Sequence, residues 1–147
     1  MNERAIAEFK RHLALPTAKW PAERAASMRF IAKCSPDLND KLHWLQKAIE
    51  EDPNRREQRV ELAFLYYQNR FWEPALEQVK FVLDITDKPL DYLCEDFAWS
   101  AHPYDVGSIA AWNLGEMDLA EEYTLKAIEL EPTNERLQGN LKLIRGN

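Results

Sequence analysis

The sequence predicts an all-α protein in which pairs of helices stack one after another in a single domain, residues 1–147. Three observations support this prediction. The chain has only four glycines and 46% hydrophobic residues, a composition typical of a globular protein. Apolar residues recur at steps of three and four along most of the chain. The letters AIEEDP at residues 48–53 return as AIELEP at residues 127–132.

The spacing of these two copies measures the repeating unit. Pro53 and Pro132 lie 79 residues apart, whereas stacked helix pairs repeat every ~34 residues. Two such periods leave 11 of the 79 residues over. The spacing therefore predicts a third unit between the two copies, followed by an insertion of 11 residues.

The first unit is predicted at residues 20–53, preceded by an N-terminal helix at residues 3–15. Its first helix, residues 21–33, has Pro21 just inside the start, where a proline is tolerated. Its second helix, residues 40–52, is capped by Asn39 or Asp40.

The middle unit spans residues 56–89 and contains two helical patterns with a break between them. The break falls at residues 69–72, and Pro74 follows it. Pro74 sits in the first turn of the second helix, where its missing N–H costs nothing. The periodic apolar positions on either side of the break are Leu62, Ala63, Tyr66, Ala75, Val79 and Val82.

The third unit spans residues 101–134, and Gly115 supplies the positive φ that ends its first helix. Between the second and third units lies the insertion LDYLCEDFAWS, residues 90–100. Because this insertion is apolar, we expect it to be helical and packed. A last helix at residues 134–144, capped by Thr133 or Asn134, covers the end of the stack.

Charge is unevenly distributed. The net charge is −6, yet residues 1–33 hold seven Lys/Arg and only three Asp/Glu. The remaining acidic part disfavours nucleic-acid partners, and the basic N-terminal residues are explained by a solvated helix face. Cys34 and Cys94 have no metal-binding spacing, so we expect two reduced thiols. The charged N-terminus and the absence of a long apolar run predict a cytoplasmic protein without a membrane partner.

No motif for catalysis is present. The acids of DLND at residues 37–40 and DITD at residues 84–87 are better explained by helix ends than by a metal. The three histidines lack partners at ligand or triad spacing, and no Gly-rich phosphate loop can be formed. The sequence therefore predicts no catalytic residue, no metal and no cofactor.

Aromatic residues on the first helices predict a partner groove. Trp44 and Trp72 fall at packing positions, but Trp112 lies on a stripe that would face the concave side. Since none of the stripe positions carries Lys or Arg, we expect an apolar or helical protein segment rather than a peptide carboxylate. The alternative is that the insertion or the N-terminal helix fills the groove. The groove candidates are Val60, Phe64, Tyr67, Gln68, Asp105, Ile109, Trp112 and Asn113.

The units resemble the tetratricopeptide repeat (TPR), which implies a TPR-like right-handed α-solenoid. The resemblance rests on Ala at the start of the second helix, Ala or Val seven residues later and Pro five beyond that, as in Ala120, Ala127 and Pro132. Two positions depart from the pattern: Asp87 stands where Pro is usual, and Gly107 where a large apolar residue is usual.

A narrower resemblance covers residues 20–144. The blocks WPAERAASMRFIAKC, KLHWLQKAIEEDPNRREQRVELAFLYYQ, YDVGSIAAWNLG and NERLQGNLKLI are similar to the helical tail of bacterial and phage family 2 (GT-A) glycosyltransferases. This resemblance implies a non-catalytic scaffold that binds a glycosyltransferase catalytic domain or its acceptor. Two other hypotheses remain: a homodimeric assembly module, and a chain that transfers sugar itself.

Overall fold

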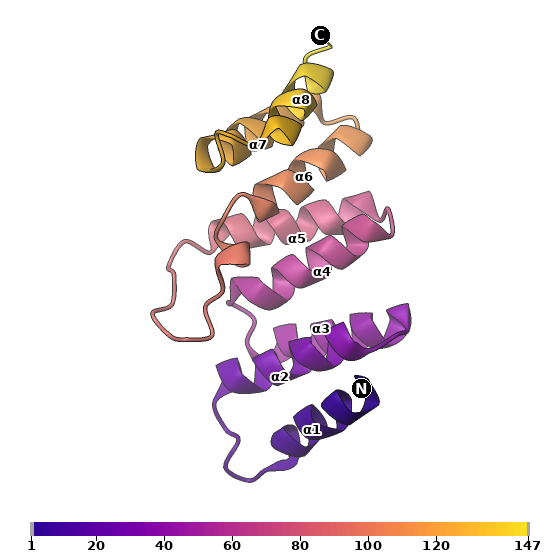
Figure 1. Cartoon of the computed structure of the whole chain (residues 1–147), viewed down its shortest axis with the longest axis vertical. Coiled ribbons are helices and arrows are strands. Elements are labelled where there is room, and N and C mark those ends of the chain that lie inside the picture. The colour runs from indigo at the N-terminus through magenta and orange to yellow at the C-terminus, as the bar shows by residue number, and fades with distance from the viewer. Residues whose placement is uncertain (1, 147) are drawn as a thin grey trace.

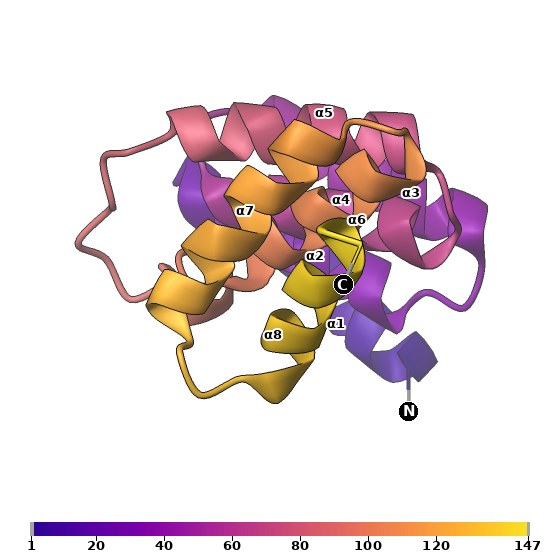
Figure 2. The ribbon, with the colours of Figure 1, turned by 90° about the horizontal axis from the view of Figure 1, so that it is seen from above.

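The computed structural model describes residues 2–146, and all regular structure among them is helical. Successive helices pack against one another in a consecutive array (Figures 1 and 2). The all-α prediction is therefore confirmed. The helices are α1 (Asn2–Ala14), α2 (Pro21–Cys34), α3 (Leu38–Glu51), α4 (Arg56–Gln68), α5 (Trp72–Asp84), α6 (His102–Asn113), α7 (Met117–Leu130) and α8 (Glu135–Ile144).

Most predicted helix boundaries agree with the structure to within two residues. Pro21 begins α2, and Asn134 caps α8 by accepting a hydrogen bond from the backbone N–H of Arg136. The predicted cap of α3 is wrong, because that helix starts earlier and its N-cap position is Asp37 rather than Asn39 or Asp40. No helix in residues 2–146 is long and apolar enough to cross a bilayer.

The predicted helical insertion is also wrong. Between α5 and α6 the chain forms a long loop whose only regular part is a single 3₁₀ turn, Asp96–Ala98. We call residues 85–101 the strap. In Figure 1 it leaves the end of α5, runs past α4 and returns to the start of α6.

The repeated alanines permit close helix contact. Ala48, Ala75, Ala120 and Ala127 are all completely buried at the contacts between helices. Gly107 is required for the same reason, since a Cβ there would lie 2.7 Å from Val79 Cγ1 and 2.9 Å from Tyr123 Cδ2. The space that a large apolar residue would occupy is thus already filled by the side chains of neighbouring helices.

Candidate binding groove

The strap is fixed at both ends by one arginine of α4. Arg56 donates hydrogen bonds to the carbonyl oxygens of Ile85, at 2.9 Å, and Ala98, at 3.1 Å. Its guanidinium also lies 4.0 Å from the ring centroid of Trp99. The side chain of Ala98 is buried against Val60 and Val82. The strap is therefore packed onto the N-terminal half of α4.

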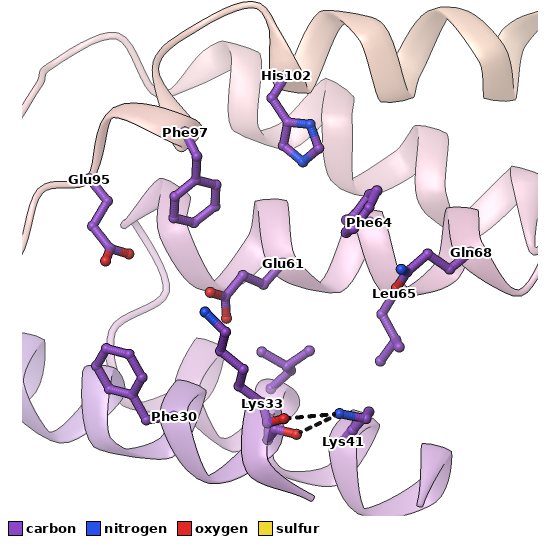
Figure 3. Close-up of a pocket in the computed structure, with 12 residues that line it drawn as sticks. Phe30, Lys33, Lys41, Glu61, Phe64, Leu65, Gln68, Glu95, Phe97 and His102 are labelled. Carbon is purple, nitrogen blue, oxygen red and sulfur yellow. Dashed lines mark hydrogen bonds between the residues drawn. The ribbon is translucent and has the colours of Figure 1, made fainter. Parts of the chain in front are cut away.

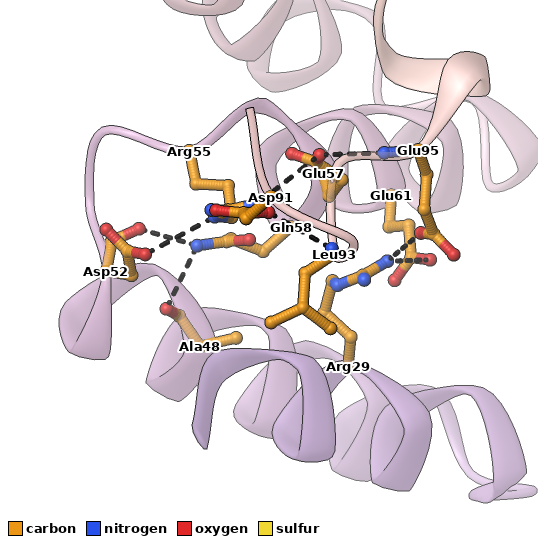
Figure 4. Close-up of polar contacts among 10 residues, drawn as sticks. All are labelled: Arg29, Ala48, Asp52, Arg55, Glu57, Gln58, Glu61, Asp91, Leu93 and Glu95. Atoms are coloured by element: carbon orange, nitrogen blue, oxygen red, sulfur yellow. Dashed lines mark hydrogen bonds and ion pairs between the residues drawn. The ribbon is translucent and has the colours of Figure 1, made fainter. Parts of the chain in front are cut away.

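Ion pairs fix the middle of the strap (Figure 4). Arg55 pairs with Asp91, and the buried carboxylate of Glu57 accepts a hydrogen bond from the backbone N–H of Glu95 at 3.1 Å. Arg29 of α2 reaches the strap from the other side and donates to Glu95 at 2.7 Å. The strap thus joins α2 to α4, although these helices belong to different helix pairs.

The strap forms part of the wall of a half-open cavity between the α2–α3 pair and α4. We call this space the seam cavity; its volume is about 470 Å³ (Figure 3). Three phenylalanines from three separate elements contribute to its wall: Phe30 from α2, Phe64 from α4 and Phe97 from the strap. The complete lining is Phe30, Ala32, Lys33, Lys41, Leu45, Glu61, Phe64, Leu65, Gln68, Glu95, Phe97 and His102.

A second hollow continues from Phe30 toward the N-terminus. It has a volume of about 390 Å³ and lies among α1, α2 and Leu93 of the strap. Phe9 of α1 stacks on Phe30 with 5.3 Å between ring centroids. His12, on the same wall, contacts the Ser27 hydroxyl at 2.7 Å between Nδ1 and Oγ. Phe30 therefore separates two adjacent hollows on one side of the array.

Burial shifts two titratable groups in the seam cavity. Desolvation raises the pKa of Glu61 above its ordinary value, although Arg29 opposes this shift. Desolvation lowers the pKa of His102, whose ring lies edge-on to Phe64 and Phe97 at 5.0 and 6.4 Å between centroids. The histidine contributes an aromatic edge to the cavity wall. Among residues 2–146, no group of three or more His, Cys, Asp or Glu side chains is placed to hold a metal ion.

The candidates from α4 divide between cavity and core. Phe64 and Gln68 line the seam cavity, and Tyr67 stacks on Phe64 at 5.6 Å between centroids. Val60 is only 2% exposed and packs with Val82 and Ala98, so it cannot contact a partner. The sequence places Val60 on the groove stripe, whereas the structure buries it beneath the strap, whose path is not visible in the sequence.

The candidates from α6 lie outside the seam cavity. Asp105 pairs with Arg136 of α8, and Asn113 donates a hydrogen bond to the carbonyl of Ile109. Trp112 remains 39% exposed, whereas Trp44 and Trp72 pack against the core as predicted.

Several lining residues were missed from the sequence. The helical pattern and the insertion account for three lining residues without indicating a cavity: Phe30, Leu45 and Phe97. The sequence could have indicated Phe97, since the apolar side chains of an insertion between two helix pairs are expected to pack on a neighbouring element. The sequence does not indicate the role of Arg29, because its partners Glu61 and Glu95 are 32 and 66 residues away.

Comparison with known proteins adds no assignment. No protein-family model matches the chain, and no curated protein matches it significantly.

Proposed function

We propose that this chain is a non-catalytic interaction module that binds an apolar or helical segment of another protein in the seam cavity. One observation carries the proposal: three phenylalanines from α2, α4 and the strap line a cavity of about 470 Å³. Mostly apolar cavities with a few polar groups are typical binding sites. On this proposal the helix pairs form a TPR-like right-handed solenoid.

The resemblance to glycosyltransferase tails suggests the partner. The bound segment would belong to the catalytic domain of a family 2 glycosyltransferase or to its acceptor, and both proteins would meet in the cytoplasm. The chain then serves assembly or acceptor binding while another domain transfers the sugar.

A co-purification experiment tests this function. Tagged chain is co-expressed with a family 2 glycosyltransferase, and capture is compared for the parent, Phe64→Leu and Phe81→Leu. Phe81 is a matched control because it lies on α5, is 43% exposed and does not line the cavity. We expect Phe64→Leu alone to reduce capture. Equal capture by all three, or full transferase activity without this chain, would exclude the proposal.

Self-association is the second candidate. Leu130 and Leu143, at the C-terminal end of the array, are 52% and 59% exposed, and exposed apolar groups of this kind occur in interfaces. Light scattering across a hundredfold range of concentration tests it, since a constant monomer mass leaves this candidate without support.

A further inference from the structure

Two carboxylates meet at the strap end of the seam cavity. Glu61 comes from α4 and Glu95 from the strap, and both line the cavity. Arg29 reaches both through a single nitrogen, Nη1, which lies 3.1 Å from Glu61 Oε1 and 2.7 Å from Glu95 Oε2 (Figure 4). One buried guanidinium therefore faces two carboxylates, and it leaves the second oxygen of each to another donor.

Aromatic rings surround the same space. Phe30, Phe64 and Phe97 all lie around these carboxylates in Figure 3. The face of an aromatic ring attracts a cation, and the attraction grows as water is excluded. Arg29 already shows this preference, because its guanidinium carbon lies 5.6 Å from the centroid of Phe30.

Other charged groups also face the cavity. Lys33 extends from α2 toward Glu61 in Figure 3, and its charge lowers the pKa of Glu61. Lys41, from α3, instead donates to the carbonyl oxygens of Ala32 and Lys33, both at 3.2 Å. Burial lowers the pKa of His102, which favours its neutral form. Burial is the main cause of the raised pKa of Glu61; the neighbouring Glu95 carboxylate raises it further, and the charges of Arg29 and Lys33 oppose the shift.

We infer that the seam cavity takes the side chain of a lysine or arginine from the bound segment. This inference rests on the proposed function and specifies its ligand. The aliphatic stem of the side chain packs against the phenylalanine rings, and its charged head reaches the remaining oxygens of Glu61 and Glu95. The incoming cation takes the place toward which Lys33 now extends.

Three capped pentapeptides test the inference. They have the sequence Ala-Phe-Xaa-Leu-Ala, with Xaa as arginine, norleucine or glutamate, and binding is followed by amide NMR shifts in the parent protein. We expect the arginine peptide to bind about tenfold more tightly than the norleucine peptide, and the glutamate peptide to bind most weakly.

Variants separate the charge effect from a loss of structure. Glu61→Gln and Glu95→Gln should each weaken the arginine peptide at least about threefold and leave the norleucine peptide unchanged. Lys33→Ala, on the exposed rim, should strengthen only the arginine peptide, because it removes a competing cation. A higher affinity for the arginine peptide cannot arise from misfolding of the variant.

The outcomes distinguish the two proposals. Equal or tighter binding of the norleucine peptide overturns the inference and leaves the proposed apolar groove intact. Unchanged arginine affinity in Lys33→Ala also overturns it. Absence of shifts at the cavity with all three peptides counts against the proposed function as well.

Discussion

Arg70 and Gly115 occupy the same position in two turns that lie 45 residues apart. Both have positive φ, 60° for Arg70 and 79° for Gly115. In each turn the following N–H bonds to a carbonyl five residues earlier: Phe71 to Tyr66, and Glu116 to Ala111, both at 2.9 Å. The two helix pairs thus end their first helices with the same motif, once with glycine and once with arginine.

Arg70→Gly should therefore stabilise the protein. A left-handed conformation costs a non-glycine residue about 1–2 kcal/mol, and the flexibility of glycine costs about 0.5–1 kcal/mol. We expect a net gain of about 0–1.5 kcal/mol in the free energy of unfolding, measured by urea denaturation. Gly115→Ala is the reciprocal control and should destabilise, although a Cβ there meets nothing within 4 Å. A loss in Arg70→Gly would contradict this account.

Gly107→Ala should destabilise by overpacking. The added methyl group would lie 2.7 Å from Val79 Cγ1 and 2.9 Å from Tyr123 Cδ2. Overpacking of this kind costs about 1–3 kcal/mol. Gly139→Ala is a matched control because Gly139 is also helical but has open space around it, so this change should be neutral or stabilising. The thermal unfolding midpoints of both variants test this prediction. An unchanged midpoint for Gly107→Ala would contradict it.

Acid should loosen the strap through Asp91. The hydrogen bond from Arg55 is the main cause that lowers the pKa of Asp91, so the pairing favours the folded state when the carboxylate is ionised. This contribution is complete above the ordinary aspartate pKa of ~3.9 and is lost as pH falls through the lower folded value. We expect amide exchange at residues 90–96 to accelerate below pH 4, relative to α5 and α6. Asp91→Asn should show fast exchange at every pH; strap exchange that parallels that of the helices in both proteins would refute the prediction.

The contribution of Glu61 to stability should have a pH dependence opposite to that of Asp91. Burial raises its pKa, so the folded state binds this proton more tightly than the unfolded state. Its contribution is most favourable below the ordinary glutamate pKa of ~4.3 and is lost as pH rises through the folded value. Glu61→Gln, which keeps an acceptor for Arg29, should be more stable than the parent at pH 7 and equal to it at pH 4. Denaturation curves at the two pH values measure the difference, and a destabilised variant at pH 7 would show that Arg29 dominates.

Local sequence patterns were sufficient to predict the helices. The 45-residue offset between Arg70 and Gly115 equals one period plus 11 residues, in agreement with the arithmetic from Pro53 and Pro132. The conformation of the 11 residues could not be predicted, because apolar spacing in LDYLCEDFAWS is compatible with a helix. Polar groups at the N-terminal end of α4 hold its extended path instead: the N-cap residue Arg55, and Arg56 and Glu57 of the helix.

The candidate site was predicted only where it depends on a single helix. Phe64 and Gln68 follow from the helical stripe of α4, and both line the seam cavity. Phe30, Glu95 and Phe97 join them through contacts between remote parts of the chain. Such contacts leave no periodic trace in the sequence.

The strap also has a consequence for folding. Most contacts here join helices adjacent in the chain, and an array of this kind can unravel from either end. The strap adds contacts of high sequence separation: Arg29 meets Glu95 across 66 residues, and Tyr92 meets Glu23 across 69. Because such contacts tend to close late in folding, we expect the strap to form after the helices it connects. Once closed, it should couple fraying of α2 to disruption of α4, so that these helices unfold together.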